Sequence, residues 1–138
     1  MWLLDTCVVS ELTRKAPIAS VVQWLRRYGN EAALSMVTLG EIQYGIERLP
    51  AGRPRNSLQL WFDGLCAQYG NRTLPTDEAI WRTYGRLKAS VESIGRPQED
   101  FDLLIAATAT VHRLTVVTRN TKHFIDSGVK TLNPWLSR

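Results

Sequence analysis

The stretch Leu3-Leu4-Asp5-Thr6 sets the pattern on which this chain is built. Its two large apolar residues predict a short buried strand that ends at a carboxylate. A polar residue, Thr6 or Ser10, then begins a short helix that ends near Arg14-Lys15. The same succession of an apolar strand and a helix recurs along the chain. Further strands are predicted at 32–35, 71–74, 114–118 and 129–132.

The segments between these strands carry helical spacing of apolar residues and helix stop signals. Three of the predicted helices span Pro17–Tyr28, Arg53–Tyr69 and Glu99–Arg113. A fourth is capped by Thr38 and closed by Pro50 and Gly52, and a fifth is capped by Thr76 and ended by Gly95 and Pro97. Short strands that alternate with helices indicate an α/β fold with a mainly parallel sheet of about five strands. Functional groups in such sheets gather outside the carboxyl ends of the strands, which directs attention to Asp5, 35–41 and 118–121.

The composition is that of one globular domain, 1–138. The hydrophobic fraction is 44% and the charged fraction 22%, which excludes a disordered chain. No stretch approaches 18 uncharged apolar residues and the N-terminus lacks a basic region, so we expect no membrane span, no signal peptide and a cytoplasmic location. Cys7 and Cys66 are isolated and suggest neither a disulfide framework nor a zinc site.

The charge balance is modestly basic. The 17 basic residues, 13 of them Arg, stand against 13 acidic ones and leave a net charge of +4. Guanidinium groups match phosphate oxygens, so this excess suits a polyanionic partner, although many basic proteins bind no nucleic acid.

Three carboxylates are the candidate functional groups. Asp5 ends a buried strand, where a carboxylate is costly unless it is paired or binds a cation. The alternative to a functional role is a purely structural one as the N-cap of the following helix. Glu41 lies on the flank of its helix, roughly 120° from the apolar stripe, with Gly45 one turn on leaving open space beside it. Asp102 shares a helix face with small buried residues and is favoured over its competitor Asp100.

A polar residue after the fourth predicted strand could support these acids. Asn120 can orient a water or a metal ion, or it is an ordinary turn residue. Carboxylates cannot gather as bare anions without strong repulsion, and oxygen ligands alone select hard cations, which points to Mg²⁺ or Mn²⁺. Such a site activates water against a phosphodiester. The chain has no glycine-rich nucleotide loop and no nucleophile elbow.

The ordered motifs resemble a known family. They are Leu4-Asp5-Thr6-Cys7 through Leu12, Ser35 through Ile46 with Glu41 inside, Asp102-Leu103-Leu104-Ile105-Ala106-Ala107, Val117-Thr118-Arg119-Asn120-Thr121-Lys122-His123-Phe124, and Asn133-Pro134-Trp135. Each is weak alone, but together they run over essentially the whole chain. The set resembles the PIN-domain family and, within it, the VapC-type toxins of bacterial toxin–antitoxin pairs.

The resemblance implies a three-layer α/β/α sandwich with strand order 3-2-1-4-5 and a Mg²⁺- or Mn²⁺-dependent endoribonuclease. Its catalytic and metal-binding acids map onto Asp5, Glu41 and Asp102, supported by Thr6, Asn120 and His123. It also implies a homodimer that a cognate antitoxin silences, with operator DNA bound only through that antitoxin.

Two positions depart from the family pattern. Cys7 stands where Asn is frequent, and the 118–124 segment offers Asn120 and His123 where many members carry a fourth acid. The resemblance therefore leaves open whether a second metal ion is bound.

Two other classes of function compete with a nuclease. A non-catalytic PIN-like module would bind RNA or a protein with its acidic cluster reduced, which the retention of three mapped acids disfavours. A phosphorylated receiver-like domain would need an acidic pair before its first helix and a late strand ending in Lys, and the chain has neither.

Basic and aromatic residues give two further expectations. The candidates for RNA contact follow the motif segments and are Arg14, Lys15, Arg48, Arg119 and Lys122. Four of the tryptophans, Trp24, Trp61, Trp81 and Trp135, exceed what one small core readily hides, and the excess favours a homodimer interface.

Overall fold

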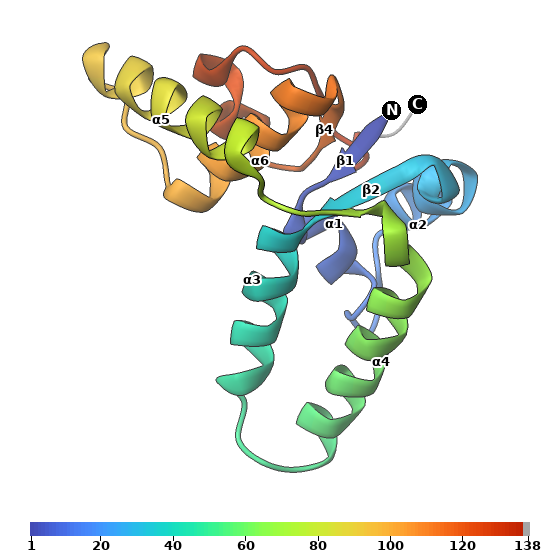
Figure 1. The fold of residues 1–138 in the computed structure, drawn as a ribbon. Helices are drawn as coiled ribbons and strands as arrows, with labels where there is room; N and C mark the ends of the chain where they lie inside the picture. Colours follow the sequence, from blue (N-terminus) through green and yellow to red (C-terminus); the bar gives the residue numbers. More distant parts are fainter. Residues whose placement is uncertain (137–138) are drawn as a thin grey trace.

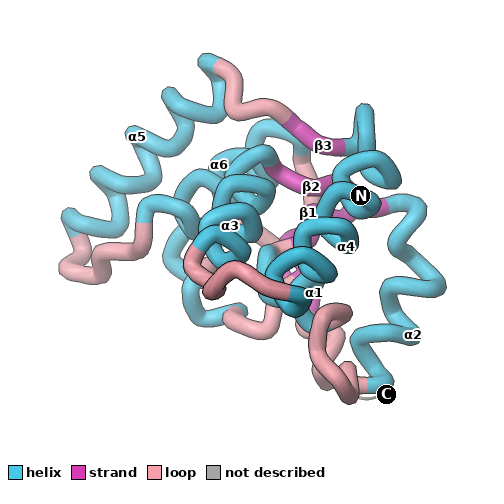
Figure 2. Tube along the Cα trace, turned by 90° about the horizontal axis from the view of Figure 1, so that it is seen from below, coloured by secondary structure: helices cyan, strands magenta, loops and turns pink. Residues whose placement is uncertain are grey.

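The computed structural model describes residues 1–136, which form a central parallel sheet with helices on both faces (Figures 1 and 2). The five strands found there are β1 Trp2–Leu4, β2 Ala32–Ser35, β3 Thr73–Leu74, β4 Thr115–Val117 and β5 Thr131–Leu132. Their order is β3-β2-β1-β4-β5 and every pairing is parallel. The helices are α1 Thr6–Glu11, α2 Ala19–Tyr28, α3 Met36–Glu47, α4 Arg53–Tyr69, α5 Glu78–Ser93 and α6 Asp100–His112. The predicted α/β/α sandwich and strand order are confirmed.

The two faces of the sheet carry separate cores because neighbouring strand residues point to opposite sides. Leu4 and Val117 pack with α1, α2 and α4 on one face. Leu3 and Val116, their immediate neighbours, pack with α6 and Phe124 on the other. All four strand residues are fully buried. The central strands therefore sit in a fixed register, which fixes where their carboxyl ends emerge.

Two helices begin at residues other than the predicted caps. The Ser35 hydroxyl accepts from the Val37 backbone N–H (3.1 Å) and caps α3, so Thr38 lies inside the helix and is buried. Asp77 caps α5 by accepting from the Ile80 N–H (3.0 Å), and Thr76 stands outside it. In both cases the better-placed neighbour satisfies the free N–H groups of the first turn.

Helices α3 and α4 form a long antiparallel hairpin that extends away from the sheet (Figure 1). Gly52 precedes α4 at φ +149°, a backbone conformation that favours glycine, and Pro54 lies in the first turn of that helix. In residues 1–136 no helix is both long and apolar enough to span a bilayer.

Candidate active site at the carboxyl edge of the sheet

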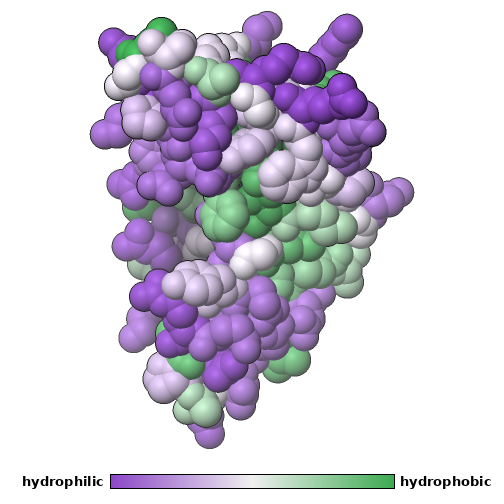
Figure 3. Space-filling view, turned by 60° about the vertical axis from the view of Figure 1, so that its left-hand side comes forward, coloured by the Kyte–Doolittle hydropathy of each residue, from purple (hydrophilic) through white to green (hydrophobic). Residues whose placement is uncertain are grey.

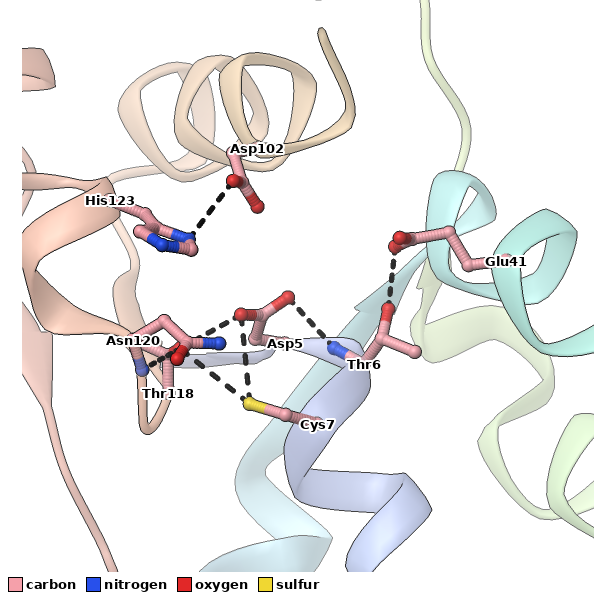
Figure 4. A network of polar contacts seen from close by, with 8 residues as sticks. All are labelled: Asp5, Thr6, Cys7, Glu41, Asp102, Thr118, Asn120 and His123. Atoms are coloured by element: carbon pink, nitrogen blue, oxygen red, sulfur yellow. Dashed lines mark hydrogen bonds and ion pairs between the residues drawn. The ribbon is translucent and has the colours of Figure 1, made fainter. Parts of the chain in front are cut away.

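Asp5 lies at the end of β1, and its backbone N–H continues the ladder to the Val117 carbonyl (2.9 Å). The residue is only 6% exposed, so both carboxylate oxygens need partners. Oδ1 accepts from the Thr6 backbone N–H (2.8 Å), and Oδ2 accepts from the Thr118 hydroxyl (2.8 Å) (Figure 4). Asp5 is thus the N-cap of α1, and the same carboxylate faces the site.

Glu41 projects from α3 toward the start of α1. The Thr6 hydroxyl donates to Glu41 Oε1 across 2.6 Å (Figure 4). It also lies 3.3 Å from the Thr38 hydroxyl. Partial burial raises the pKa of Glu41; the Thr6 hydrogen bond opposes that rise, while the charges of Asp5 and Asp102 add to it. Nothing lies within 4 Å of where a Cβ on Gly45 would stand, so the space expected there is open.

Asp102 and its competitor Asp100 point to different surroundings. Asp102 Oδ2 lies 3.2 Å from His123 Nδ1 (Figure 4). Burial raises the pKa of Asp102, the Asp5 charge raises it further, and His123 lowers it. Asp100 instead accepts from the Tyr84 hydroxyl (2.7 Å) and Lys88 Nζ (2.9 Å) at the surface, and these contacts lower its pKa.

The three carboxylates share one electrostatic environment. Asp5 and Asp102 both raise the pKa of Glu41, and Asp5 also raises that of Asp102. Like charges at this edge of the sheet disfavour ionisation of their neighbours, and a divalent cation would relieve that repulsion. Their oxygen donors are of the kind that Mg²⁺ and Mn²⁺ prefer.

The present side-chain positions do not yet form a metal cage. Among residues 1–136, no three His, Cys, Asp or Glu side chains stand in an arrangement that would hold a metal ion as placed. Each carboxylate is held by a protein donor: Asp5 by Thr118, Glu41 by Thr6 and Asp102 by His123. The donor set fits a hard cation in its chemistry, and these side chains would have to turn toward a common point to bind it.

Thr118 lies in the 118–121 segment to which the strand pattern points, but it is not among the predicted site residues. It is fully buried, donates to Asp5 and accepts from the Asn120 backbone N–H (3.0 Å). The available signal was a polar side chain at the end of a buried strand adjacent to β1. Asn120, for its part, is tied to the site through its backbone.

Cys7 lies beside Asp5 in the position where the family pattern often has Asn. Its sulfur lies 3.7 Å from both Asp5 Oδ2 and the Thr118 hydroxyl oxygen. Burial, and then the Asp5 charge, raise the pKa of this thiol to about 11. The thiol is therefore protonated near neutral pH and is a weak donor to Asp5.

The structure spreads the predicted RNA contacts widely. Arg119 directly precedes Asn120, and its guanidinium carbon lies 5.4 Å from the Trp135 ring centroid. Lys122 lies in the short 3₁₀ turn Thr121–His123 that follows Asn120. Arg14 forms a 3.6 Å ion pair with the buried Glu11, whose other oxygen accepts from the Ile18 N–H (2.9 Å). Lys15, like Arg14, is exposed beyond the end of α1. Arg48 follows the last residue of α3, seven residues beyond Glu41 or about 10 Å along the helix axis, and so lies away from the three acids.

Comparison with known proteins agrees with this geometry. The PIN domain model matches residues 2–127. The VapC ribonuclease Y4jK of Sinorhizobium fredii is 35% identical over 98% of each chain, and Toxin FitB of Neisseria gonorrhoeae is 36% identical over 98% of this chain and 99% of its own. The structure of FitAB bound to an IR36 DNA fragment contains a chain that aligns with a TM-score of 0.93 at 34% identity, covering 100% of this chain and 98% of that one. The protein therefore belongs to the PIN-domain family, among its VapC-type members.

Proposed function

We propose that this protein is a divalent-metal-dependent endoribonuclease that acts as the toxin of a toxin–antitoxin pair. The observation that carries the proposal is the convergence of Asp5, Glu41 and Asp102 on one environment at the carboxyl edge of the sheet, where their charges oppose one another. The names of the relatives, a VapC ribonuclease and a toxin, support the same activity.

The residues at this edge of the sheet have separate roles in the proposed reaction. Asp5 and Asp102 would hold the cation with Glu41 beside them, and Mg²⁺ or Mn²⁺ when bound would neutralise charge on the phosphodiester and activate the attacking water. Thr118 and the Thr6 backbone N–H fix Asp5, while the Thr6 hydroxyl holds Glu41. A carboxylate of raised pKa such as Glu41 is suited to accept a proton from water.

The proposed partners follow from the relatives and from the surface. A cognate antitoxin would silence the toxin and carry any contact with operator DNA. The related FitAB assembly bound to a DNA fragment supports a DNA contact of the complex. We place the protein in the cytoplasm, where such an RNA target is found.

A homodimer is proposed from exposed apolar side chains. Met36 and Tyr44 on α3 and Trp81 on α5 are exposed, Trp81 to 49%. Figure 3 shows hydrophobic surface gathered across the middle of one face of the molecule. Trp24, Trp61 and Trp135 instead pack partly buried against the core, so the tryptophan argument for an interface rests on Trp81.

The test is cleavage of a panel of structured and single-stranded RNAs with Mg²⁺, with Mn²⁺ and in EDTA. Asp5→Asn and Asp102→Asn are expected to remove most activity, and Glu41→Gln as well, because a neutral amide neither balances the cation's charge nor supports ionised water. Asp100→Asn is the matched control, two residues from Asp102 on the same helix, and should cleave like wild type. Undiminished cleavage in excess EDTA would refute the metal mechanism, and RNA binding without cleavage under any condition would favour the non-catalytic module.

A further inference from the structure

A cavity of about 740 Å³ opens between α2 and the segment that contains β5 and the residues after it. We call it the α2 cleft and define it by Trp2, Trp24, Arg27, Tyr28, Thr121 and Asn133, which are among its lining residues. The Ser20 hydroxyl lies 3.5 Å from the Trp135 carbonyl oxygen, which ties the start of α2 to this segment. The α2 cleft is separate from the three carboxylates, none of which lines it.

Aromatic rings form one wall of the α2 cleft. Trp2, Trp24 and Tyr28 make a mutually packed cluster with ring centroids 5.2 to 5.8 Å apart. All three are only partly buried. The rings are tilted or edge-on to one another, at interplanar angles of 41° to 81°, and so do not form one flat surface. Aromatic rings beside an open volume of this size suit a flat aromatic ligand, because nucleic-acid bases stack on individual ring faces largely without regard to sequence.

The charge of the α2 cleft selects an anion. Arg27 is exposed, and its guanidinium carbon lies 5.4 Å from the Tyr28 ring centroid. Among the residues that the structure shows lining the cleft, Arg27 is the single charged side chain and none is acidic. A guanidinium beside an aromatic wall, with uncharged polar groups opposite, matches a nucleotide, whose phosphate would pair with Arg27 while its base stacks.

The sheet register places the α2 cleft close to the proposed active site. Leu132, which lines it, pairs with Val117, and Val117 pairs with Leu4, the residue before Asp5. Two inter-strand spacings of roughly 4.8 Å put the β5 side of the cleft, at Leu132, about 10 Å from the end of β1. A stacked single strand advances about 3.4 Å per nucleotide, so the gap corresponds to about three nucleotides. Thr121, on the rim, directly follows Asn120.

We propose that the α2 cleft binds a nucleotide of the single-stranded RNA substrate a few residues away from the scissile phosphate, with the base on the Trp2–Trp24–Tyr28 wall and a phosphate on Arg27. The inference rests on the proposed ribonuclease function, because it takes the same RNA strand to run from the carboxylates into the cleft. It assigns to this surface a role in holding substrate that is independent of the acids.

The test measures RNA affinity in EDTA, where cleavage is blocked, by fluorescence anisotropy of a labelled single-stranded RNA 12-mer at several KCl concentrations. Arg27→Ala should weaken binding about fivefold or more and lower the slope of log affinity against log salt by about 0.7, the loss of one phosphate contact to a single strand. Arg26→Ala is the matched control, since it removes the same charge from the same turn and Arg26 does not line the cleft. An abasic strand of equal length should bind more weakly than the RNA, and Tyr28→Leu should reduce that difference.

The outcomes separate the cleft from the nuclease. Equal weakening by Arg26→Ala and Arg27→Ala, or equal affinity for RNA and the abasic strand, would overturn the nucleotide site and indicate general attraction to α2. If Arg27→Ala cleaves RNA like wild type and binds it with unchanged affinity, the nucleotide site in the cleft is overturned while the proposed nuclease activity stands. Arg27-dependent, base-dependent binding with no cleavage of any RNA would support a nucleotide site in the cleft but overturn the nuclease, and with it the placement of that site beside a scissile phosphate.

Discussion

The imidazole Nδ1 of His123 lies 3.2 Å from Oδ2 of Asp102 and so holds a carboxylate that comes from a helix 21 positions earlier in the chain. A fourth acid at this place would repel Asp102, whereas His123 lowers its pKa against the effects of burial and of Asp5. The pair therefore offsets part of the repulsion among the acids in the metal-free protein.

Removal of His123 should make Asp102 harder to ionise. We expect the pKa of Asp102 to rise further in His123→Ala, because burial and the Asp5 charge then act without their opposing partner. Carboxyl ¹³C chemical shifts followed through a pH titration of the chelated protein measure this directly. An Asp102 titration that is the same in both proteins would show that the His123 contact has no effect on the pKa of Asp102.

The acidic cluster should destabilise the metal-free protein at neutral pH. Asp102 and Glu41 have raised pKa values in the folded state, so at these two groups the folded protein binds more protons than the unfolded chain. Stability therefore falls as pH rises from the ordinary carboxyl pKa up through the folded-state values. Asp102→Asn should melt higher than wild type in EDTA at pH 7 and gain less from Mn²⁺, because metal binding to the folded state stabilises it.

Asp100→Asn is the control for this melting experiment, because its carboxylate is paired with Lys88 and Tyr84 outside the cluster. It should not stabilise the chelated protein and should gain as much from Mn²⁺ as wild type. If Asp102→Asn melts lower than wild type in EDTA, the assignment of Asp102 to a repelling cluster is wrong.

The hydroxyl of Thr118 should contribute to the stability of the folded protein. Thr118→Val deletes the hydroxyl that donates to Asp5 Oδ2 and accepts from the Asn120 N–H, at nearly constant volume. Loss of a buried hydrogen bond to a charged group should cost about 1.5–3 kcal/mol of unfolding free energy, measured by urea denaturation. Thr108→Val offers a matched control, since Thr108 is equally buried but donates only to the Leu104 carbonyl oxygen within its helix (2.8 Å). Equal losses in the two variants would argue against a special role for the Asp5 contact.

Cys7 should react slowly with thiol reagents in spite of its place in the site. With a pKa of about 11, only about one thiol in a thousand is ionised at pH 8. Asp5→Asn should lower that pKa, because the Asp5 charge is the second cause of its rise after burial. The rate of disulfide-reagent modification against pH, measured in a Cys66→Ser background, reports the shift. A profile that Asp5→Asn leaves unmoved would place Cys7 outside the influence of the carboxylate.

The alternation of short apolar runs with amphipathic segments determined the α/β fold, because strand and helix periods are local properties of the chain. It also located Asp5, since a carboxylate at the end of a buried strand can be read directly from Leu3-Leu4-Asp5. Asp102 could be favoured over Asp100 on the same grounds, from the small residues that share its helix face. These features depend on neighbours within a few residues.

Tertiary structure alone decided which polar groups meet. Thr6 donates to Glu41 across 35 positions, Thr118 to Asp5 across 113, and the partners come from different strands and helices. Thr38 shows that residue type alone does not decide which residue caps a helix. Thr38 suits a cap, but Ser35 at the end of β2 lies closer to the free N–H groups and caps α3. The α2 cleft likewise joins Trp2, α2 and the residues around β5, segments that no local pattern connects. Such contacts follow from the order and register of the strands, which bring distant residues together only when the sheet is assembled.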